Sequence, residues 1–271
     1  VACALRKPFE HTPYLFLFGP ENSGKSTLYE SLRLLLTKGV VEADRALTNS
    51  NDFNGELAGA IICAIEEKDI TKHPGAHAKI KKWVTGRTIS IRKMRHDSYE
   101  QPNTTHWIQT ANSRDACPVF PGDSRITMIY VPDLLPGQEI GQEKLMARLE
   151  EEAPHFLHTL MHLELPPVIC RHSLPVLKTA SKQRTEEDNR SPLEIFIDEC
   201  CETRADAKLL TFKEFYARFC EWLPANEKHH WTKQRAQREL PVRHPLVTGH
   251  AGTRFVSGLV LRPVTAEGDA K

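Results

Sequence analysis

Apolar residues in the first half of the chain form short unbroken runs, separated by amphipathic stretches. Such runs predict strands that are buried on both faces, since a strand with one wet face alternates apolar and polar residues. We expect these strands at 14–18, 60–65, 106–110 and 126–131. Apolar residues at helical spacing predict helices over 26–37 and 76–84. Strands that alternate with helices indicate an α/β fold with a parallel sheet.

The pattern becomes mainly helical from about residue 140. A long helical period covers 143–163, and the polar, charged stretch 173–189 predicts a linker. Ser191 and Pro192 suit the cap and first turn of a further helix. Two more helices (211–222 and 230–240) and strands at 246–248 and 255–261 complete the pattern of a winged helix-turn-helix. We therefore predict a core at 1–140, a helical extension and linker at 141–190, and a winged helix-turn-helix-like domain at 191–265.

The first apolar run leads directly into a phosphate-binding motif, G-x-x-x-x-G-K-S over 19–26. Glycines at both ends let the backbone N–H groups turn toward phosphates, and the N-terminus of the following helix faces the same anion. Lys25 is expected to reach the β- and γ-phosphates of ATP, and the Ser26 hydroxyl to bind Mg²⁺. A chance glycine-rich turn would lack the flanking strand and amphipathic helix. The residues expected to hold ATP are Gly19, Pro20, Glu21, Asn22, Ser23, Gly24, Lys25, Ser26 and Thr27.

Two carboxylates end the second buried run. We assign Glu66 to the Mg²⁺ shell and Glu67 to polarising the attacking water. The alternative is a solvated charge pair, because Lys68 and Asp69 continue the charged stretch.

Polar residues also flank the last two strands. Asn112 could orient the water, although an Asn at a strand end is usually a turn former. An isolated arginine such as Arg125 is more often a surface ion-pair partner than an arginine finger.

A block of basic residues with no acid lies between 79 and 96, and its sequence indicates a hairpin after the strand 88–91. Such a block can neutralise nucleic-acid phosphates, although many charge runs are only solvated surface. Its members are Lys79, Lys81, Lys82, Arg87, Arg92, Lys93 and Arg95.

The order of these parts resembles a superfamily 3 helicase, in particular the primase-helicases of phages, plasmids and large DNA viruses. The resemblance rests on GPENSGKST, IICAIEEKD, KIKKWVTGRTISIRKMRHDSYEQPNTTHWIQTAN and DSRITMIYV, within residues 14–132. It implies an AAA+-like P-loop three-layer sandwich followed by a small winged-helix domain. It also implies a ring, usually a hexamer, that translocates 3′ to 5′ on single-stranded or fork DNA, with room for a primase domain upstream in the same chain.

The resemblance also assigns roles by position. Glu66 and Glu67 match the Walker B acids, Asn112 the sensor asparagine, and Arg125 the finger that reaches the ATP of a neighbouring subunit. Lys93, with Arg92 and Arg95, matches the hairpin that grips DNA. The Glu-Glu pair departs from the Asp-Glu or Asp-Asp of many relatives. Arg114 remains an alternative finger, since it closely follows the sensor.

Composition narrows the function without deciding it. The charged share of 26% is that of an ordinary globular protein, and the net charge of +1 gives no overall basic field. No run reaches the roughly 20 apolar residues that span a bilayer. Seven scattered Cys suggest reduced thiols, which predicts a cytoplasmic protein, in the host cell if the element is viral or plasmid-borne. The chain begins without Met, which suggests a piece of a longer protein.

We therefore expect an ATP-dependent DNA helicase. A ring ATPase for DNA packaging or initiator loading, and a nucleotide-gated DNA-binding module, remain alternatives. A small-molecule kinase is disfavoured by the basic hairpin and the winged tail.

Overall fold

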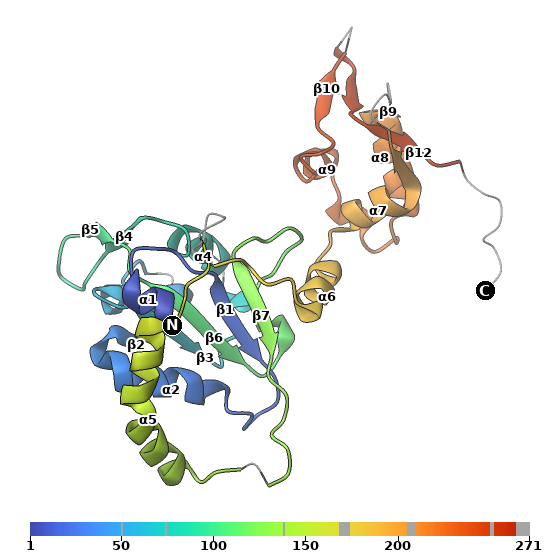
Figure 1. Cartoon of the computed structure of the whole chain (residues 1–271). Coiled ribbons are helices and arrows are strands. Elements are labelled where there is room, and N and C mark those ends of the chain that lie inside the picture. Colours follow the sequence, from blue (N-terminus) through green and yellow to red (C-terminus); the bar gives the residue numbers. More distant parts are fainter. Residues whose placement is uncertain are drawn as a thin grey trace. The chain divides into compact units, whose positions relative to one another are not determined.

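The computed structural model describes residues 1–49, 51–73, 75–137, 139–167, 174–204, 210–249 and 252–263. The chain divides into two compact units, Val1–Asn189 and Arg190–Lys271 (Figure 1). No helix among the described residues is both long and apolar enough to cross a membrane.

The first unit is built on a five-stranded sheet whose neighbouring strands are all parallel. Its spatial order is β2-β3-β6-β1-β7. The strands are β1 (Tyr14–Phe18), β2 (Val40–Glu42), β3 (Ile62–Glu66), β6 (His106–Ala111) and β7 (Ile126–Tyr130). One strand, β6, thus separates β1, which leads into the phosphate-binding motif, from β3, which ends in the glutamates. The predicted strands and the α/β class are confirmed.

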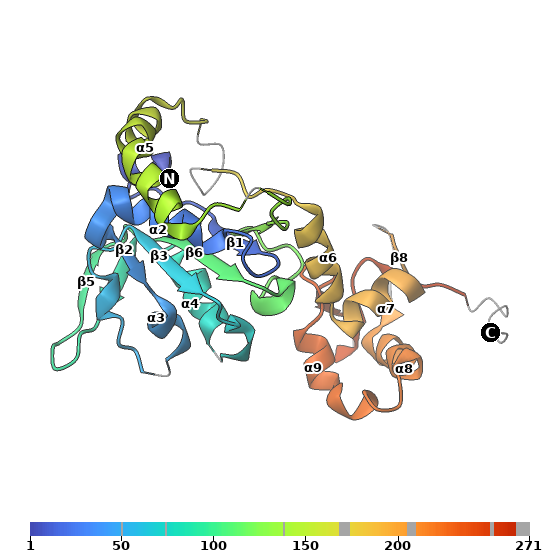
Figure 2. The same ribbon diagram turned by 90° about the horizontal axis from the view of Figure 1, so that it is seen from below.

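Helices cover both faces of this sheet, so the unit has three layers (Figures 1 and 2). The first unit contains α1 (Ala2–Arg6), α2 (Lys25–Leu36), α3 (Asp44–Thr48), α4 (Ala76–Trp83), α5 (Gln142–His162) and α6 (Ala180–Asp188). Short 3-10 turns complete it: η1 (Thr37–Gly39), η2 (Gly55–Leu57), η3 (Ile70–Lys72) and η4 (Arg114–Ala116).

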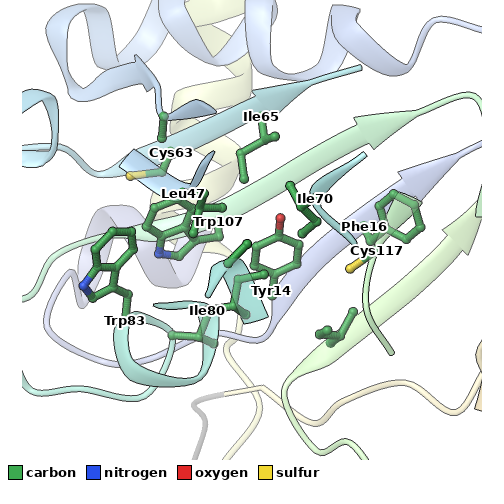
Figure 3. Close-up of a cluster of buried hydrophobic side chains, with 14 of the residues drawn as sticks. Tyr14, Phe16, Leu47, Cys63, Ile65, Ile70, Ile80, Trp83, Trp107 and Cys117 are labelled. Carbon is green, nitrogen blue, oxygen red and sulfur yellow. The ribbon is translucent and has the colours of Figure 1, made fainter. Parts of the chain in front are cut away.

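Alternate side chains of β1 pack into the two cores of this unit, one on each face of the sheet. Phe16 packs with α3 and α4, whereas Leu17 packs with Leu32 of α2 on the other face. The larger core is rich in aromatic rings, and Trp107 stacks on Trp83 with a centroid distance of 5.6 Å (Figure 3). Continuous apolar runs are therefore required, because both faces of each strand are buried.

The second half of the basic block forms the expected hairpin, whereas Lys79, Lys81 and Lys82 lie on α4. Strands β4 (Thr88–Ile91) and β5 (Tyr99–Pro102) pair antiparallel, with Ile91 opposite Tyr99. The connection 92–98 is exposed.

Part of the segment expected to be a linker is a helix instead. Helix α6 packs against β7, and its Lys182 and Thr185 are buried. The linker prediction rested on the polar sequence, which here makes hydrogen bonds rather than solvent contacts. Ser173, where the expected linker began, lies outside the described residues.

The second unit has its own core, built around Phe196, Phe215, Phe219 and Trp231. Its helices are α7 (Pro192–Cys200), α8 (Phe212–Trp222) and α9 (Lys233–Arg238), with a 3-10 turn η5 (Lys228–His230). Its strands are β8 (Cys201–Thr203), β9 (Leu210–Thr211), β10 (Leu246–Thr248), β11 (Arg254–Val256) and β12 (Leu259–Leu261). They form two sheets, ordered β10-β11-β9 and β12-β8.

Two expected elements of this unit differ in the structure. The helix expected over 230–240 begins later, because the Thr232 hydroxyl accepts the backbone N–H of Arg235 and caps α9. The strand expected over 255–261 is split into β11 and β12 by a turn at Ser257 and Gly258, where φ of Gly258 is +72°. The turn sends the two strands to different sheets.

Candidate nucleotide site

The phosphate-binding motif forms the loop between β1 and α2. Gly24 is the residue before α2 and has a left-handed backbone, with φ of +80°. Gly19 lies against the end of β7, where a Cβ would be 2.0 Å from the carbonyl oxygen of Val131. The loop therefore needs glycine at both positions, for conformation at Gly24 and for close approach at Gly19.

Lys25 holds this loop together. Its ammonium is buried and donates to the carbonyl oxygens of Gly19 (2.9 Å) and Pro20 (2.5 Å) and to the hydroxyl of Ser23 (3.2 Å). An ammonium has three N–H donors, so these oxygens satisfy all of them. These three oxygens hold the positive charge of Lys25 at the centre of the loop.

A cavity of about 530 Å³ opens over the loop. Its polar side contains Glu67 and Asn112, together with the loop residues from Glu21 to Thr27. Apolar side chains from the other side, Leu134, Ile140, Leu145 and Met146, line it as well. Of the residues predicted for the nucleotide site, Gly19, Pro20, Glu66 and Arg125 are not among those lining the cavity.

The sheet register sets the position of the two glutamates. Glu66 is opposite Thr110 of β6, and the backbone N–H of Glu67 donates to the Thr110 carbonyl at 2.9 Å. Glu67 has a positive φ of +47°, which is uncommon for a non-glycine residue. The strand thus turns sharply at Glu67, whose side chain is exposed and lines the cavity.

Glu66 is half-buried and connects with α2 rather than with the cavity. The buried phenol of Tyr29 is hydrogen-bonded to Glu66 and to Ser26. Burial and the Glu66 carboxylate raise the pKa of Tyr29 well above its usual value. The tyrosine therefore stays a neutral donor to Glu66, and it brings the loop serine and this glutamate into one hydrogen-bonded chain. The backbone N–H of Glu66 is also fixed, by Asp44 Oδ1 at 3.2 Å.

The donors available here suit Mg²⁺. Among the described residues there is no group of three His, Cys, Asp or Glu side chains that would form an all-protein metal cage. The hydroxyl of Ser26 and the carboxylates of Glu66 and Glu67 are hard oxygen donors, which Mg²⁺ uses together with phosphate oxygens and water.

The two arginines that could act as a finger have different surroundings. Arg114 Nη2 lies 2.5 Å from Asp188 Oδ2, so its guanidinium is engaged within the unit. Arg125 Nη1 lies 4.0 Å from Asp123 Oδ2, and its side chain is 24% exposed. Neither lines the cavity, and a finger that reaches a neighbouring subunit's ATP has no need to do so.

The three predicted DNA-binding residues lie in the turn of the hairpin. Arg92, Lys93 and Arg95 are all exposed, and Met94 beside them is 69% exposed. The buried side chain of Asn54 accepts the backbone N–H of Arg92 (2.8 Å) and donates to the Ser90 carbonyl (2.8 Å). The hairpin therefore presents its cations from a fixed base.

Two of the three basic residues of α9 contact aromatic rings, and the third is exposed. Arg235 Nε donates to Glu239 Oε1 at 2.9 Å, and its guanidinium lies 4.3 Å from the centre of the Trp231 ring. Lys233 lies 5.8 Å from the ring centre of Tyr216. Arg238 is 79% exposed in its side chain.

Several site residues were not expected from the sequence. Tyr29 lies one helical turn after Ser26, a spacing that could have indicated their contact. Thr110 could have been found only from the register of β3 and β6. The apolar lining comes partly from the segment before α5, which has no periodicity that would reveal it.

The fold and the site together define a P-loop ATPase-like α/β unit in which β6 lies between β1, which leads into the phosphate-binding loop, and β3, which ends at Glu66. A family model described as a family of unknown function (DUF5906) matches residues 17–125. A comparison with curated proteins finds no match.

Solved structures of the C-terminal region of NrS-1 share this fold. One apo structure has a TM-score of 0.64 at 16% identity and covers 96% of this chain and 70% of that one. An A-form apo structure has a TM-score of 0.60 at 19% identity and covers 88% and 54%, respectively. Another A-form apo structure has a TM-score of 0.61 at 16% identity and covers 93% and 68%. At these identities the likeness concerns the fold.

Proposed function

We propose that this chain is an ATP-dependent DNA helicase of a replication protein, which translocates on single-stranded DNA as a ring, most simply a hexamer. The observation that carries the proposal is the shared cavity, which joins the loop 21–27 to Glu67 and Asn112. A protein that only binds nucleotide needs no water-polarising carboxylate and no amide beside it.

The proposed chemistry follows from the positions of these groups. Lys25 exchanges its loop oxygens for the β- and γ-phosphates of ATP, while the backbone N–H groups of the loop take the remaining phosphate oxygens. Mg²⁺, when bound at Ser26 and Glu66, neutralises charge on the phosphates. Glu67 accepts a proton from the attacking water, and Asn112 orients that water. Arg125 stabilises the charge that develops on the ATP of the neighbouring subunit.

The hairpin supports a nucleic-acid substrate. Arg92, Lys93 and Arg95 lie together in an exposed turn, and such cations suit a grip on the phosphate backbone. Single-stranded or fork DNA is the partner that this surface would take.

The test separates ATP chemistry from DNA work. We expect ATP hydrolysis that DNA stimulates, together with displacement of a labelled strand from a fork. Lys25→Ala should abolish both activities. Lys93→Ala should keep basal ATP hydrolysis within about twofold and abolish strand displacement, because the salt-dependent phosphate contact is lost.

Lys38→Ala is the matched control, since Lys38 is an exposed lysine of η1 that belongs neither to the hairpin nor to the residues lining the cavity. Stimulated hydrolysis without strand displacement would favour DNA packaging or initiator loading. Nucleotide binding without any turnover would favour a nucleotide-gated DNA-binding module.

A further inference from the structure

Helix α6 is attached to the first unit by polar contacts. Its sequence, ASKQRTEED, has no apolar face, and only Lys182 and Thr185 are buried. The Thr179 hydroxyl caps the helix and donates to the Met128 carbonyl of β7 at 2.8 Å. The helix is therefore placed by specific hydrogen bonds, which fix position more closely than apolar packing does.

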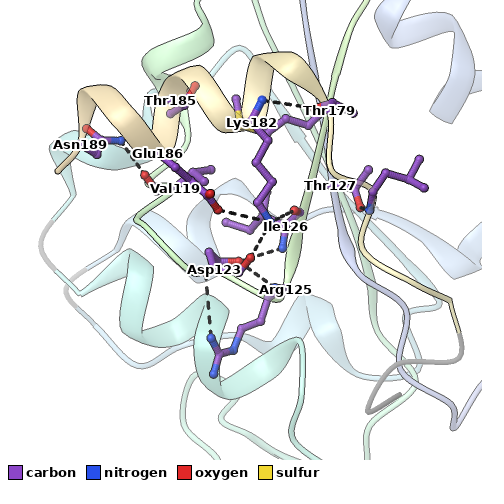
Figure 4. A network of polar contacts seen from close by, with 12 residues as sticks. Val119, Asp123, Arg125, Ile126, Thr127, Thr179, Lys182, Thr185, Glu186 and Asn189 are labelled. Carbon is purple, nitrogen blue, oxygen red and sulfur yellow. Dashed lines mark hydrogen bonds and ion pairs between the residues drawn. The ribbon is translucent and has the colours of Figure 1, made fainter. Parts of the chain in front are cut away.

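The most buried of these contacts is made to the turn that carries Arg125 (Figure 4). The Lys182 ammonium donates to the carbonyl oxygens of Asp123 (2.5 Å) and Ile126 (2.8 Å). From within the turn, Asp123 Oδ1 accepts the backbone N–H groups of Arg125 (2.7 Å) and Ile126 (3.0 Å). Lys182 and Asp123 thus fix both ends of the peptide segment on which the Arg125 side chain stands.

The same helix also determines which arginine is available. Asp188, at the end of α6, engages Arg114, and Asn189 donates to the Val119 carbonyl at 2.6 Å. Among the described residues, the ion pair of Arg125 is the longer one, 4.0 Å to Asp123 Oδ2, and the other oxygen of that carboxylate accepts two backbone N–H groups.

We propose that Lys182 is a positioning residue for hydrolysis in trans: from α6 it fixes the turn 123–126, so that Arg125 meets the ATP of the neighbouring subunit. The inference rests on the proposed function. Without the ammonium, the buried Ile126 carbonyl and the part-buried Asp123 carbonyl would lose their donor, and the turn would rearrange to satisfy them. A displacement of about 1 Å in a catalytic group can cost about 100-fold in rate.

The first test compares Lys182→Met with Lys178→Met, an exposed lysine four residues earlier. We expect Lys182→Met to lower kcat for ATP about 10- to 100-fold, with the KM for ATP changed less than twofold and the circular dichroism spectrum unchanged. Lys178→Met should behave like the wild type. If Lys182→Met unfolds at the assay temperature, Lys182→Gln replaces it; its amide is uncharged and one atom shorter, so kcat should fall in the same direction by a smaller factor.

Mixing of subunits decides whether the defect acts in trans. Lys182→Met mixed with Glu67→Gln should regain hydrolysis, since intact sites then receive a well-placed Arg125. Lys182→Met mixed with Arg125→Ala should regain none, because neither partner supplies a competent arginine. Arg125→Ala mixed with Glu67→Gln is the positive control.

The outcomes separate this inference from the proposed function. An inactive wild type would refute both. An active wild type and an inactive Arg125→Ala, together with a fully active Lys182→Met, would refute only the role of Lys182. If the Lys182→Met and Glu67→Gln mixture stays inactive while the positive control is active, Lys182 acts on the ATP site of its own subunit. That result would overturn the inference.

Discussion

Gly19 and Gly59 both have positive φ values, but their surroundings differ. A Cβ on Gly19 would lie 2.0 Å from the Val131 carbonyl oxygen, whereas a Cβ on Gly59 would meet nothing within 4 Å. Gly59→Ala should therefore lower the free energy of unfolding only by the backbone strain, about 1 kcal/mol. Gly19→Ala must also displace backbone, and it should cost more stability and weaken ATP binding at least tenfold. Urea unfolding and equilibrium nucleotide titration measure the two effects, and equal losses for both variants would contradict this account of the loop.

His106 makes the first unit sensitive to mild acid. It accepts or donates through Nδ1 to the Thr12 hydroxyl (2.9 Å), and burial lowers its pKa to about 4. In the unfolded chain its pKa is about 6.5, so the unfolded state takes up the proton first as the pH falls. The contribution of His106 to the free energy of unfolding is therefore constant above about pH 6.5, and stability is lost between about pH 6.5 and 4.

The histidine's share can be isolated by substitution. Between pH 7 and pH 5 the wild type should lose about 2 kcal/mol of unfolding free energy more than His106→Gln does. Denaturant unfolding at the two pH values gives this difference directly, and because the other titrating groups are common to both proteins they cancel. Parallel pH profiles would show that His106 is solvated in the folded protein.

At the scale of elements, four of the five strands of the central sheet could be predicted, together with α2, α4 and α5, because burial on both faces of a strand requires apolar runs. The three-residue strand β2 and the five-residue helices α1 and α3 are too short to show a pattern. Helix α6 could not be predicted either, since its contacts are polar and its sequence looks like a linker. The division of the strand predicted over 255–261 depends on one positive-φ turn at Gly258, which the apolar pattern does not reveal. In the site, the loop and Glu67 follow from local motifs, but Tyr29 and Thr110 depend on which elements lie side by side.

The hairpin should depend on Asn54 for its stiffness. Asn54 precedes η2 and binds the backbone on both sides of Ile91, through Ser90 and Arg92. Asn54→Ala removes both hydrogen bonds and should weaken the coupling between DNA binding and ATP hydrolysis. We expect basal ATP hydrolysis to stay within about twofold and its stimulation by DNA to fall at least fivefold. Asn49→Ala, outside the hairpin base and exposed, is the control. A loss of basal hydrolysis instead would mean that Asn54 supports the nucleotide site.

At the scale of the whole molecule, two separate sets of buried residues divide the chain between Asn189 and Arg190. Each unit has its own aromatic core, as in the stacked Trp83 and Trp107 of the first and the edge-on Phe219 and Trp231 of the second. A cooperative transition requires a shared core, so separate cores predict separate unfolding transitions. The second unit begins at Arg190, one residue from the start predicted for the last domain, whereas α6, which was expected to be part of a linker, belongs to the first unit.

Calorimetry with a ligand for one unit tests this division. A non-hydrolysable ATP analogue with Mg²⁺ at about 100 times its Kd should stabilise the first unit by about 2.7 kcal/mol and leave the other transition in place. Phe219→Ala removes a fully buried ring. It should lower the unfolding free energy of the second unit alone, by about 3–5 kcal/mol. If ligand and substitution moved one common transition, the two cores would be unfolding as a single cooperative body. If the two transitions respond independently, no shared core couples the units. Nucleotide binding to the first unit would then affect the second unit only through assembly or through DNA.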